Sequence, residues 1–266
     1  MKKPFAKILR VMLFIIFLGI FLFSGWKLWG IYKEYAHGIA AYEEISEQFV
    51  NVKIETAKSS GDPKHSSNII SEDPEPQISI DFAALKEKYP NVKGWLYCPG
   101  TPINYPIAQS EDNEYYLHRL LSGEYDKGGT LFMDCRNQED FSDWNTLVYG
   151  HNMKNDTMFG VIPDYMEQKF FDEHPVMYLL TEDCTYEIRL IGGYVTPADA
   201  EIYMIPKTVE ERDQLIHSVS RASSFDSDPE IGNEEKLITL STCVYDYENS
   251  RYVLVGALHK MEESAE

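Results

Sequence analysis

The stretch Leu237-Ile238-Thr239-Leu240-Ser241-Thr242-Cys243 is a β-branched, apolar run that ends on a thiol. Seven mostly polar residues follow it, and Arg251 then opens the next apolar run. Two strands joined by such a loop place a thiol and a guanidinium at the same edge of a sheet. Far upstream, the short apolar run Asn145–Tyr149 is followed by Gly150 and His151. We therefore expect Cys243, Arg251 and His151 at neighbouring strand ends.

These three residue types suit the steps of acyl transfer. A thiolate is a strong nucleophile toward a peptide carbonyl. A guanidinium is a permanently charged, forked donor for an oxyanion, and an imidazole exchanges protons near neutral pH. Taken singly, a strand-end Cys can be a buried hydrophobe, a loop His a turn residue and an Arg a strand-edge charge. Together, Cys243, His151 and Arg251 favour cysteine-dependent acyl transfer.

The region from residue 78 onward is mainly β with inserted helices. Strands are predicted at Gly94–Tyr97, Ile103–Gln109, Thr130–Asp134, Thr146–Tyr149, Val176–Thr181, Thr185–Val195, Leu237–Thr242 and Arg251–His259. Helices are predicted at Asp81–Tyr89, Asn113–Ser122, Met158–Phe170 and Thr208–Ala222. Eight short strands without regular βαβ alternation favour a closed or nearly closed barrel over a parallel sheet. The strand count by itself does not separate a barrel from a sandwich.

The front of the chain indicates a membrane anchor. No charge occurs from Val11 to Trp26, and four basic residues precede this stretch. A spanning helix needs about 20 apolar residues, so we expect residues 8–29 to contact the lipid bilayer. The alternative is a cleaved signal peptide, but Leu22 and Phe23 stand where a cleavage site needs small residues. The expected protein is a single-pass protein of the cell membrane, with a cytoplasmic N-terminus and an extracellular folded domain.

The chain divides into four expected parts. Residues 1–30 are a cytoplasmic tip and transmembrane anchor, and residues 31–77 are a juxtamembrane helix, over Glu34–Val50, followed by a flexible linker rich in Ser, Pro, Asp and Glu. Such a linker buries too little apolar surface to order itself. Residues 78–262 form the folded domain, and residues 263–266 a tail. About 190 residues are enough for one domain with a proper core.

Charge and cysteine usage narrow the class of protein further. The chain carries 43 acidic and 24 basic side chains, which argues against nucleic-acid binding, since that function needs a basic face. Four cysteines in an exported domain could form two disulfides, but Cys98, Cys135 and Cys184 each stand singly in or beside strands, and we expect small buried hydrophobes. No two histidines stand at metal-ligand spacing with a third, and no phosphate loop is present, so we expect no metal and no cofactor.

Thr239–Cys243 resembles the signature of sortases, membrane-bound cysteine transpeptidases of Gram-positive cell surfaces. Four further segments are similar to class B sortases, a subgroup of this family. They are Ile80–Trp95, Ile103–Ile107, Tyr149–Met153 and Met158–Gly160. The helix Thr208–Ala222, shortly before Cys243, is similar to the enlarged helical insertion of that class. The resemblance covers about residues 78–262 and implies an eight-stranded sortase-type β-barrel as the catalytic domain.

By this resemblance, the protein cleaves a C-terminal sorting signal similar to Asn-Pro-Gln-Thr-Asn after its Thr, forms a thioester on Cys243 and passes the acyl group to an amine of a cell-wall peptidoglycan precursor. The implied partners are a secreted surface protein that bears this signal and the precursor amine. His151 and Arg251 join Cys243 as the implied catalytic residues. The implied substrate-binding residues are Asn113, Leu117, Tyr149 and Ser241.

Three alternatives stay open at this stage. A pilin-polymerising sortase would use the same chemistry with a lysine of another pilin as acceptor. A secreted cysteine protease would release the acyl group to water, and a membrane-tethered adhesin would form no acyl-enzyme at all. Asp246 is a candidate to orient His151, but we favour the interpretation that it is an exposed loop aspartate. Val244 follows the cysteine where some relatives have an acidic residue.

Overall fold

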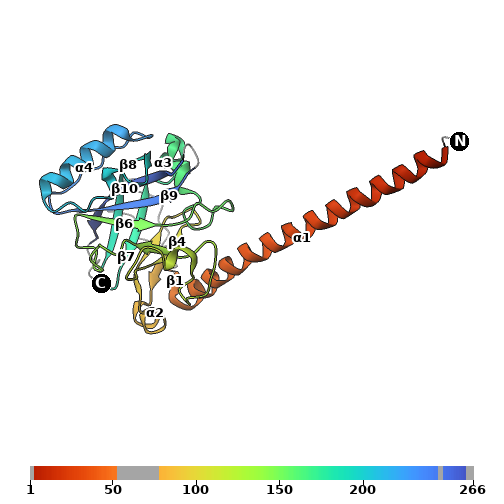
Figure 1. Ribbon diagram of the computed structural model, residues 1–266. Coiled ribbons are helices and arrows are strands. Elements are labelled where there is room, and N and C mark those ends of the chain that lie inside the picture. The colour runs from red at the N-terminus through yellow and green to blue at the C-terminus, as the bar shows by residue number, and fades with distance from the viewer. Residues whose placement is uncertain (1–2, 53–77, 245–247, 262–266) are drawn as a thin grey trace, which may run out of the picture.

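The structure is a computed structural model that describes residues 3–52, 78–244 and 248–261. Eight of its strands are β3 (Val92–Tyr97), β4 (Asn104–Ala108), β5 (Leu131–Met133), β6 (Asn145–Tyr149), β7 (Val176–Leu180), β8 (Thr185–Pro197), β9 (Lys236–Cys243) and β10 (Ser250–Lys260). They close into a barrel in the order β10-β8-β7-β3-β4-β5-β6-β9. The helix α1 (Lys3–Phe49) projects from this barrel (Figure 1). The predicted eight-stranded barrel is confirmed, and a sandwich is excluded.

Two strand pairings bring distant segments to one rim of the barrel. Strand β6 runs parallel to β9, with Tyr149 opposite Ser241, so the two strands end together. Strand β10 runs antiparallel to β9 and places Arg251 opposite Cys243. Because His151 follows β6 by two residues, the register alone carries all three predicted catalytic residues to the same rim.

Large apolar side chains are buried on both faces of the barrel strands. Trp95, Leu96 and Tyr252 are fully buried, and the indole of Trp95 donates to Asn104 Oδ1 at 2.7 Å, which satisfies its polar atom in the core. Gly193 leaves room for the ring of Tyr252, because a Cβ there would lie 2.3 Å from the Tyr252 hydroxyl. The closed barrel is therefore packed through rather than hollow.

A second apolar cluster joins α4 (Val209–Ala222) to the outside of the barrel. Leu215 and Val219 of α4 pack against Ile191, Val253 and other buried residues of β8 to β10. The Thr208 hydroxyl caps the helix by accepting from the Glu211 N–H at 3.2 Å. This helix confirms the insertion predicted before Cys243.

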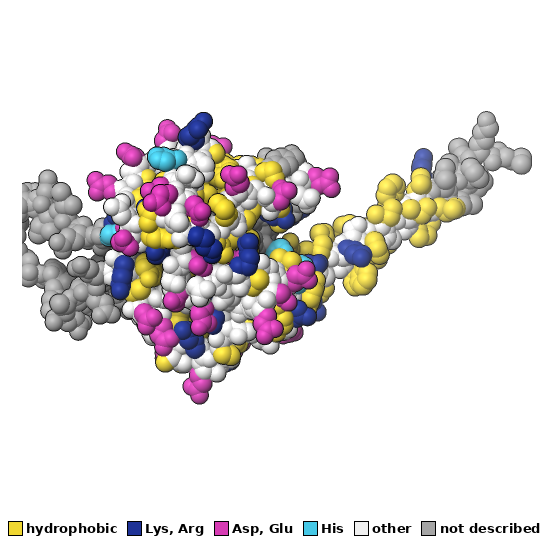
Figure 2. All heavy atoms as spheres, turned by 60° about the vertical axis from the view of Figure 1, so that its left-hand side comes forward, with side chains coloured by type: hydrophobic (Ala, Val, Ile, Leu, Met, Phe, Trp, Pro, Cys, Tyr) yellow, Lys and Arg dark blue, Asp and Glu magenta, His cyan; other side chains and the backbone are white. Residues whose placement is uncertain are grey.

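Helix α1 has two contrasting parts. Its N-terminal part is apolar and exposed, and over Arg10–Phe49 it is the one helix among the described residues that is long and apolar enough to cross a membrane. Figure 2 shows apolar side chains covering this projecting part, while acidic side chains are spread over the visible face of the barrel. Its C-terminal part buries Tyr42, Ile45 and Phe49 against the barrel. The predicted anchor and the predicted juxtamembrane segment therefore form one continuous helix.

Several short elements complete the fold. The helix predicted over Asp81–Tyr89 is confirmed as α2 (Phe82–Lys88), where Asp81 caps the helix by accepting from the Ala84 N–H at 3.0 Å. The antiparallel pair of β1 (Val50–Val52) and β2 (Ile78–Ile80) was not predicted. The linker expected before residue 78 lies largely outside the described residues.

The helix predicted over Asn113–Ser122 is wrong. The segment holds a single turn, the 3₁₀ helix η1 (Tyr116–His118). Arg119 takes an extended conformation and pairs with Tyr125 in an isolated bridge, and the chain reverses at Gly123, whose φ is 84°. A tertiary turn therefore overrides the local helical spacing.

The long helix predicted over Met158–Phe170 is also wrong. Two short helices replace it, η2 (Ile162–Met166) and α3 (Gln168–Glu173). Met158 has a φ of 55°, which excludes it from a right-handed helix. Pro163 stands at the start of η2, where its ring is tolerated, and could not continue a helix from Met158. The remaining short element is η3 (Glu201–Tyr203).

Candidate active site

A cavity of about 440 Å³ lies at the rim where β6 and β9 end. Every site residue predicted from the sequence lines it, namely Cys243, His151, Arg251, Asn113, Leu117, Tyr149 and Ser241. The remaining lining residues are Phe132, Asp134, Arg136, Gly150, Ala198, Tyr203 and Thr242. Segments more than 100 residues apart in the chain thus meet around a single pocket.

Cys243 is the last residue of β9 and a half-buried free thiol. Its carbonyl accepts from Asn152 Nδ2 at 2.9 Å, and the neighbouring Thr242 hydroxyl donates to the Gly150 carbonyl at 2.8 Å. These two bonds tie the end of β9 to the residues on either side of His151. The backbone that carries the thiol is therefore held beside the backbone that carries the imidazole.

His151 is half-buried, and its carbonyl accepts from the Phe159 N–H at 2.9 Å. Burial lowers the pKa of His151, and the charge of His118, whose ring centroid lies 5.3 Å away, lowers it further. The Gly128 backbone and the Asp126 carboxylate act in the opposite direction without reversing the shift. The lowered pKa favours the neutral imidazole, which is the form that can accept a proton.

Arg251 is half-buried near the start of β10, across from Cys243 on one side and Thr196 of β8 on the other. Its Nη1 donates to the Ser250 carbonyl at 3.0 Å. The Ser250 hydroxyl donates to the Val244 carbonyl at 2.9 Å, which closes the base of the loop between β9 and β10. Asp246, the candidate orienter of His151, lies outside the described residues.

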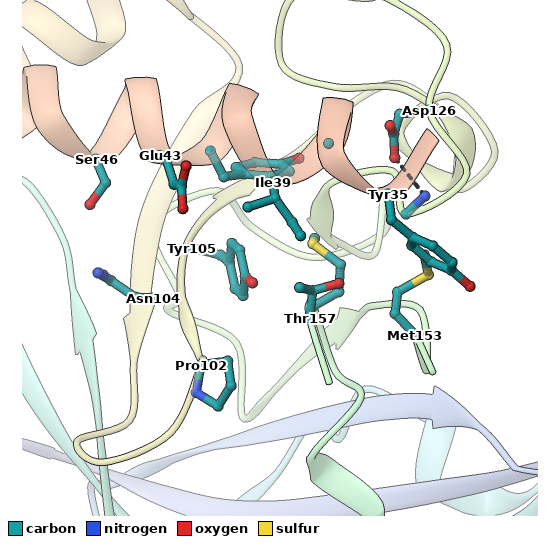
Figure 3. A pocket seen from close by; sticks show the side chains of 14 residues that line it. Tyr35, Ile39, Glu43, Ser46, Pro102, Asn104, Tyr105, Asp126, Met153 and Thr157 are labelled. Carbon is teal, nitrogen blue, oxygen red and sulfur yellow. Dashed lines mark hydrogen bonds between the residues drawn. The ribbon is translucent and has the colours of Figure 1, made fainter. Parts of the chain in front are cut away.

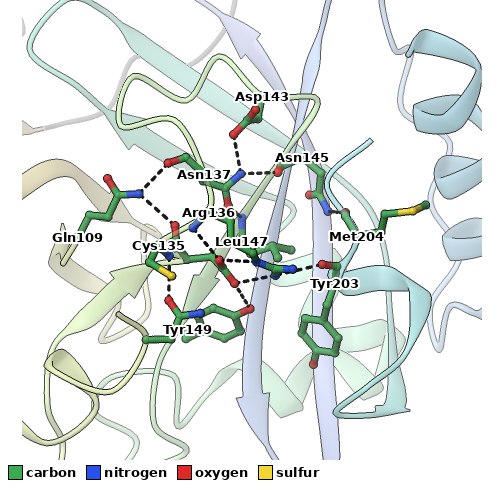
Figure 4. A network of polar contacts seen from close by, with 12 residues as sticks. Gln109, Cys135, Arg136, Asn137, Asp143, Asn145, Leu147, Tyr149, Tyr203 and Met204 are labelled. Atoms are coloured by element: carbon green, nitrogen blue, oxygen red, sulfur yellow. Dashed lines mark hydrogen bonds and ion pairs between the residues drawn. The ribbon is translucent and has the colours of Figure 1, made fainter. Parts of the chain in front are cut away.

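Asp134, Arg136 and Tyr149 of the pocket lining form a charged network that the sequence did not reveal (Figure 4). The carboxylate of Asp134, which is buried, accepts from Arg136 Nε and Nη2 and from the Tyr149 hydroxyl, each at 2.8 Å. Burial acts to raise the pKa of Asp134, but these hydrogen bonds outweigh it and hold the pKa below its ordinary value. Arg136 Nη2 also donates to the Tyr203 carbonyl at 3.2 Å.

This network holds the predicted substrate-binding residues Tyr149 and Ser241. The hydroxyls of Tyr203 and Ser241 lie 2.9 Å apart and share a hydrogen bond, and the rings of Tyr149 and Tyr203 stack with centroids 6.3 Å apart. Asp134 ends a predicted strand at this rim, which is the signal that could have identified it.

Asn137 fixes the turn below this network. Its side chain donates to the Asn145 carbonyl at 2.9 Å and accepts from the Leu147 N–H at 2.9 Å, so the turn is bonded to β6 along its length. Gln109 donates to the carbonyls of Asp134 and Asn137 at 3.0 and 2.8 Å (Figure 4). The pocket wall is therefore a rigid scaffold rather than a free loop.

The other predicted residues lie at the pocket rim. Asn113 Oδ1 accepts from the Cys135 N–H at 2.8 Å, and Leu117 packs partly buried against the main core.

The cysteines differ in burial. Cys135 is exposed, so its expected role as a buried hydrophobe is wrong, whereas Cys98 is fully buried beside the Tyr165 hydroxyl. Cys135 lies in the turn between Asp134 and Arg136, and the hydrogen bonding of that turn keeps its side chain outside the core. All four cysteines are free thiols.

Among residues 3–52, 78–244 and 248–261, no group of three or more His, Cys, Asp or Glu side chains is placed to hold a metal ion.

The fold and the pocket define the class of this protein. A sequence model of the sortase domain family matches residues 96–259, which is more than half of the chain, so the chain belongs to the sortase family and is a transpeptidase. Within the family it is a class B sortase. It is 32% identical to Sortase B of Listeria monocytogenes over 250 residues, which cover 92% of this chain and 94% of that protein.

Solved structures agree with this assignment. The Staphylococcus aureus sortase B–substrate complex is 28% identical, superposes with a TM-score of 0.64 and covers 68% of this chain and 85% of that chain. The structure of Sortase B complexed with triglycine gives the same TM-score and identity, and covers 68% of this chain and 86% of that one.

Proposed function

We propose that this protein is a membrane-anchored transpeptidase that cleaves a sorting signal similar to Asn-Pro-Gln-Thr-Asn after its Thr, carries the acyl group as a thioester on Cys243 and transfers it to a cell-wall peptidoglycan amine. The observation that carries this proposal is the pocket itself, which gathers Cys243, His151 and Arg251 at one rim. The two strands that hold Cys243 and Arg251 fix them opposite each other.

In the first step, Cys243 Sγ attacks the carbonyl carbon of the Thr of the signal. Because the lowered pKa of His151 leaves the imidazole neutral, His151 takes the thiol proton as the carbon–sulfur bond forms. The guanidinium of Arg251 stabilises the tetrahedral oxyanion. The carbon–nitrogen bond then breaks, and His151 returns its proton to the departing amine.

In the second step, an amine replaces the thiol. The acceptor amine attacks the thioester carbonyl and His151 takes its proton. The carbon–sulfur bond breaks, and His151 passes the proton to the Cys243 sulfur, which restores the thiol. The triglycine in the related sortase B structure supports an acceptor with a free amine, and the related substrate complex supports a peptide donor. A peptidoglycan amine is the acceptor expected for wall anchoring, whereas a pilin lysine would indicate polymerisation.

The helix α1 supports the proposed location. Its apolar, exposed part is preceded by basic residues, which favour the cytoplasmic side. The barrel would then lie on the outer surface, where both the secreted donor and the cell-wall acceptor are present.

The test measures how acyl product divides between amine and water. The full chain in detergent micelles is incubated with a peptide containing Asn-Pro-Gln-Thr-Asn, with and without triglycine, and products are resolved by liquid chromatography. We expect the amine to divert most of the product from the hydrolysed to the ligated form. Hydrolysis alone, unaffected by the amine, would instead identify a protease.

A further inference from the structure

A second cavity, of about 220 Å³, lies between α1 and the barrel (Figure 3). Its helical wall includes Tyr35, Ile39 and Glu43. Its barrel wall includes Gly128, from the loop before β5, and Met153, from the loop after His151. Helix α1 thus faces two segments next to the proposed catalytic His151, namely the loop that contains Gly128 and the residues that follow His151 in the chain.

A buried hydroxyl of α1 holds the loop Glu124–Thr130. The Tyr42 side chain is 8% exposed, and its hydroxyl lies 2.7 Å from the Gly129 carbonyl and 2.8 Å from Thr130 Oγ1. Thr130 donates its own proton to the Arg119 carbonyl at 2.8 Å, so the single Tyr42 proton is shared between its two acceptors. The ring of Tyr42 packs edge-on against Tyr105, with centroids 5.3 Å apart. Helix α1 therefore makes a directional bond to the loop backbone as well as an apolar contact.

Charged groups reinforce this attachment one to two turns earlier in the helix. Lys127 Nζ lies 2.5 Å from the Glu34 carboxylate. The two ring nitrogens of His37 each lie 3.6 Å from a carboxylate oxygen of the loop, one from Glu124 and one from Asp126. Gly38 allows the close approach, because a Cβ there would lie 3.0 Å from Asp126 Oδ2.

The opposite side of the same loop faces the active site. The Asp126 N–H donates to the His118 carbonyl at 3.1 Å, and the Asp126 carboxylate accepts from the Gly128 N–H at 2.7 Å. The Gly128 backbone contacts the imidazole of His151. Gly129 has a φ of 58°, and a Cβ there would lie 2.4 Å from the Tyr116 carbonyl, so the loop has little freedom to relax. The loop is a short, rigid connection between α1 and the imidazole.

We propose that the C-terminal part of α1, residues 34–49, is a positioning element of the active site: by fixing the loop Glu124–Thr130, it holds His151 at the angle and distance at which it serves Cys243. This rests on the proposed role of His151 in proton transfer. The helix that anchors the protein would thus also be needed for full catalytic rate, with Tyr42 as the principal positioning residue.

The main test uses the full chain in detergent micelles and the variant Tyr42→Phe, which keeps the ring but removes the hydroxyl. Tyr32→Phe, on the exposed part of the same helix, is the matched control. We expect kcat for peptide-to-triglycine transfer to fall about tenfold in Tyr42→Phe, because misplacing a proton-transfer group slows chemistry steeply, while Tyr32→Phe stays at the wild-type rate.

An NMR titration of His151 separates positioning from a loss of fold. The groups facing this imidazole are His118, Asp126, the Gly128 backbone and the pocket residues Cys243 and Arg251. Because Gly128 and Asp126 both raise the pKa of His151, withdrawing the loop in Tyr42→Phe should lower that pKa. An unchanged His151 titration together with a wild-type kcat would overturn the proposal.

A charge exchange gives a second, independent test. Glu34→Lys and Lys127→Glu should each lower kcat about threefold, the scale of an exposed ion pair, and the double variant should recover the wild-type rate. The exchange of Lys86 and Glu182, a pair 2.7 Å apart and remote from the pocket, serves as control. If the double variant stays as slow as its parents, residues 34–49 do not act through this contact. A wild-type chain that forms no acyl product would instead refute the proposed function.

Discussion

Replacing Arg251 by lysine or glutamine separates the proposed oxyanion role of this residue from its part in the fold. Arg251 is half-buried on β10 opposite Cys243, and its Nη1 donates to the Ser250 carbonyl at 3.0 Å. Lysine keeps the positive charge but loses the planar fork, and glutamine loses the charge as well.

The expected magnitudes differ strongly between rate and stability. Loss of an oxyanion donor lowers kcat by about 10²–10³, or roughly 2.7–4 kcal/mol of transition-state stabilisation. The hydrogen bond to Ser250 is worth only about 0.5–1.5 kcal/mol of unfolding free energy. We therefore expect Arg251→Gln to be slowed about 100-fold or more and Arg251→Lys about tenfold to 100-fold, with a folded protein in both cases.

The assay compares kcat/KM for peptide-to-triglycine transfer and the thermal midpoint of unfolding. Arg189→Lys is the matched control, because Arg189 lies on the neighbouring strand β8, pairs with Glu187 at 3.0 Å and does not line the pocket. A kcat/KM of Arg251→Gln within threefold of wild type would refute the oxyanion role.

Three further outcomes are expected. His118→Gln should raise the pKa of His151 toward its ordinary 6.5, because it removes a charge that lowers this pKa, and an NMR titration measures the change. In the wild type, neutral His151 stabilises the fold above pH 6.5, and this stability is lost as the pH falls from 6.5 to the lowered pKa of the folded state. In His118→Gln these two pKa values are closer together, so the stability should be lost over a narrower range of pH. Tyr149→Phe should lower the unfolding free energy by about 1.5–3 kcal/mol in urea titrations, because buried Asp134 loses a charge-assisted bond. Leu96→Ala should lower it by about 2–5 kcal/mol, as expected for a fully buried leucine.

Each of these expectations has an outcome that contradicts it. A His151 pKa that is unchanged or lower in His118→Gln would show that the two rings do not interact electrostatically. Tyr149→Phe as stable as wild type would show that Asp134 does not depend on this bond. The control for Leu96→Ala is Leu28→Ala, on the exposed part of α1, and equal losses in both would contradict the packed barrel interior.

The strands were predictable because most of them are short apolar runs bounded by polar or turn residues. Their closure into a barrel was expected from the family resemblance, because the strand pattern alone does not separate a barrel from a sandwich. Strand order was not predictable, because the parallel pairs β4–β5 and β6–β9 join segments that have no local signature. The two wrong helices fail for local reasons that only the fold reveals, namely the chain reversal at Gly123 and the left-handed conformation of Met158.

Some residues of the pocket could likewise be predicted from the sequence, whereas others could not. The residues predicted from strand ends and from family resemblance all line it, because a strand end is a fixed place on the barrel rim. His118 was missed because it was assigned to a helix that does not form, and its contact with His151 arises from a loop. Arg136 was missed because its role depends on Asp134, and their pairing is visible only once the turn between them is folded.

The most direct test of the account is intact-mass spectrometry of the full chain after brief exposure to a peptide containing Asn-Pro-Gln-Thr-Asn. The account predicts a covalent adduct with the mass of the peptide cut after Thr. It should persist in Cys135→Ala, which removes the exposed cysteine next to the pocket residues Asp134 and Arg136, and vanish in Cys243→Ala. An adduct that survives in Cys243→Ala would contradict the assignment of Cys243 as the nucleophile.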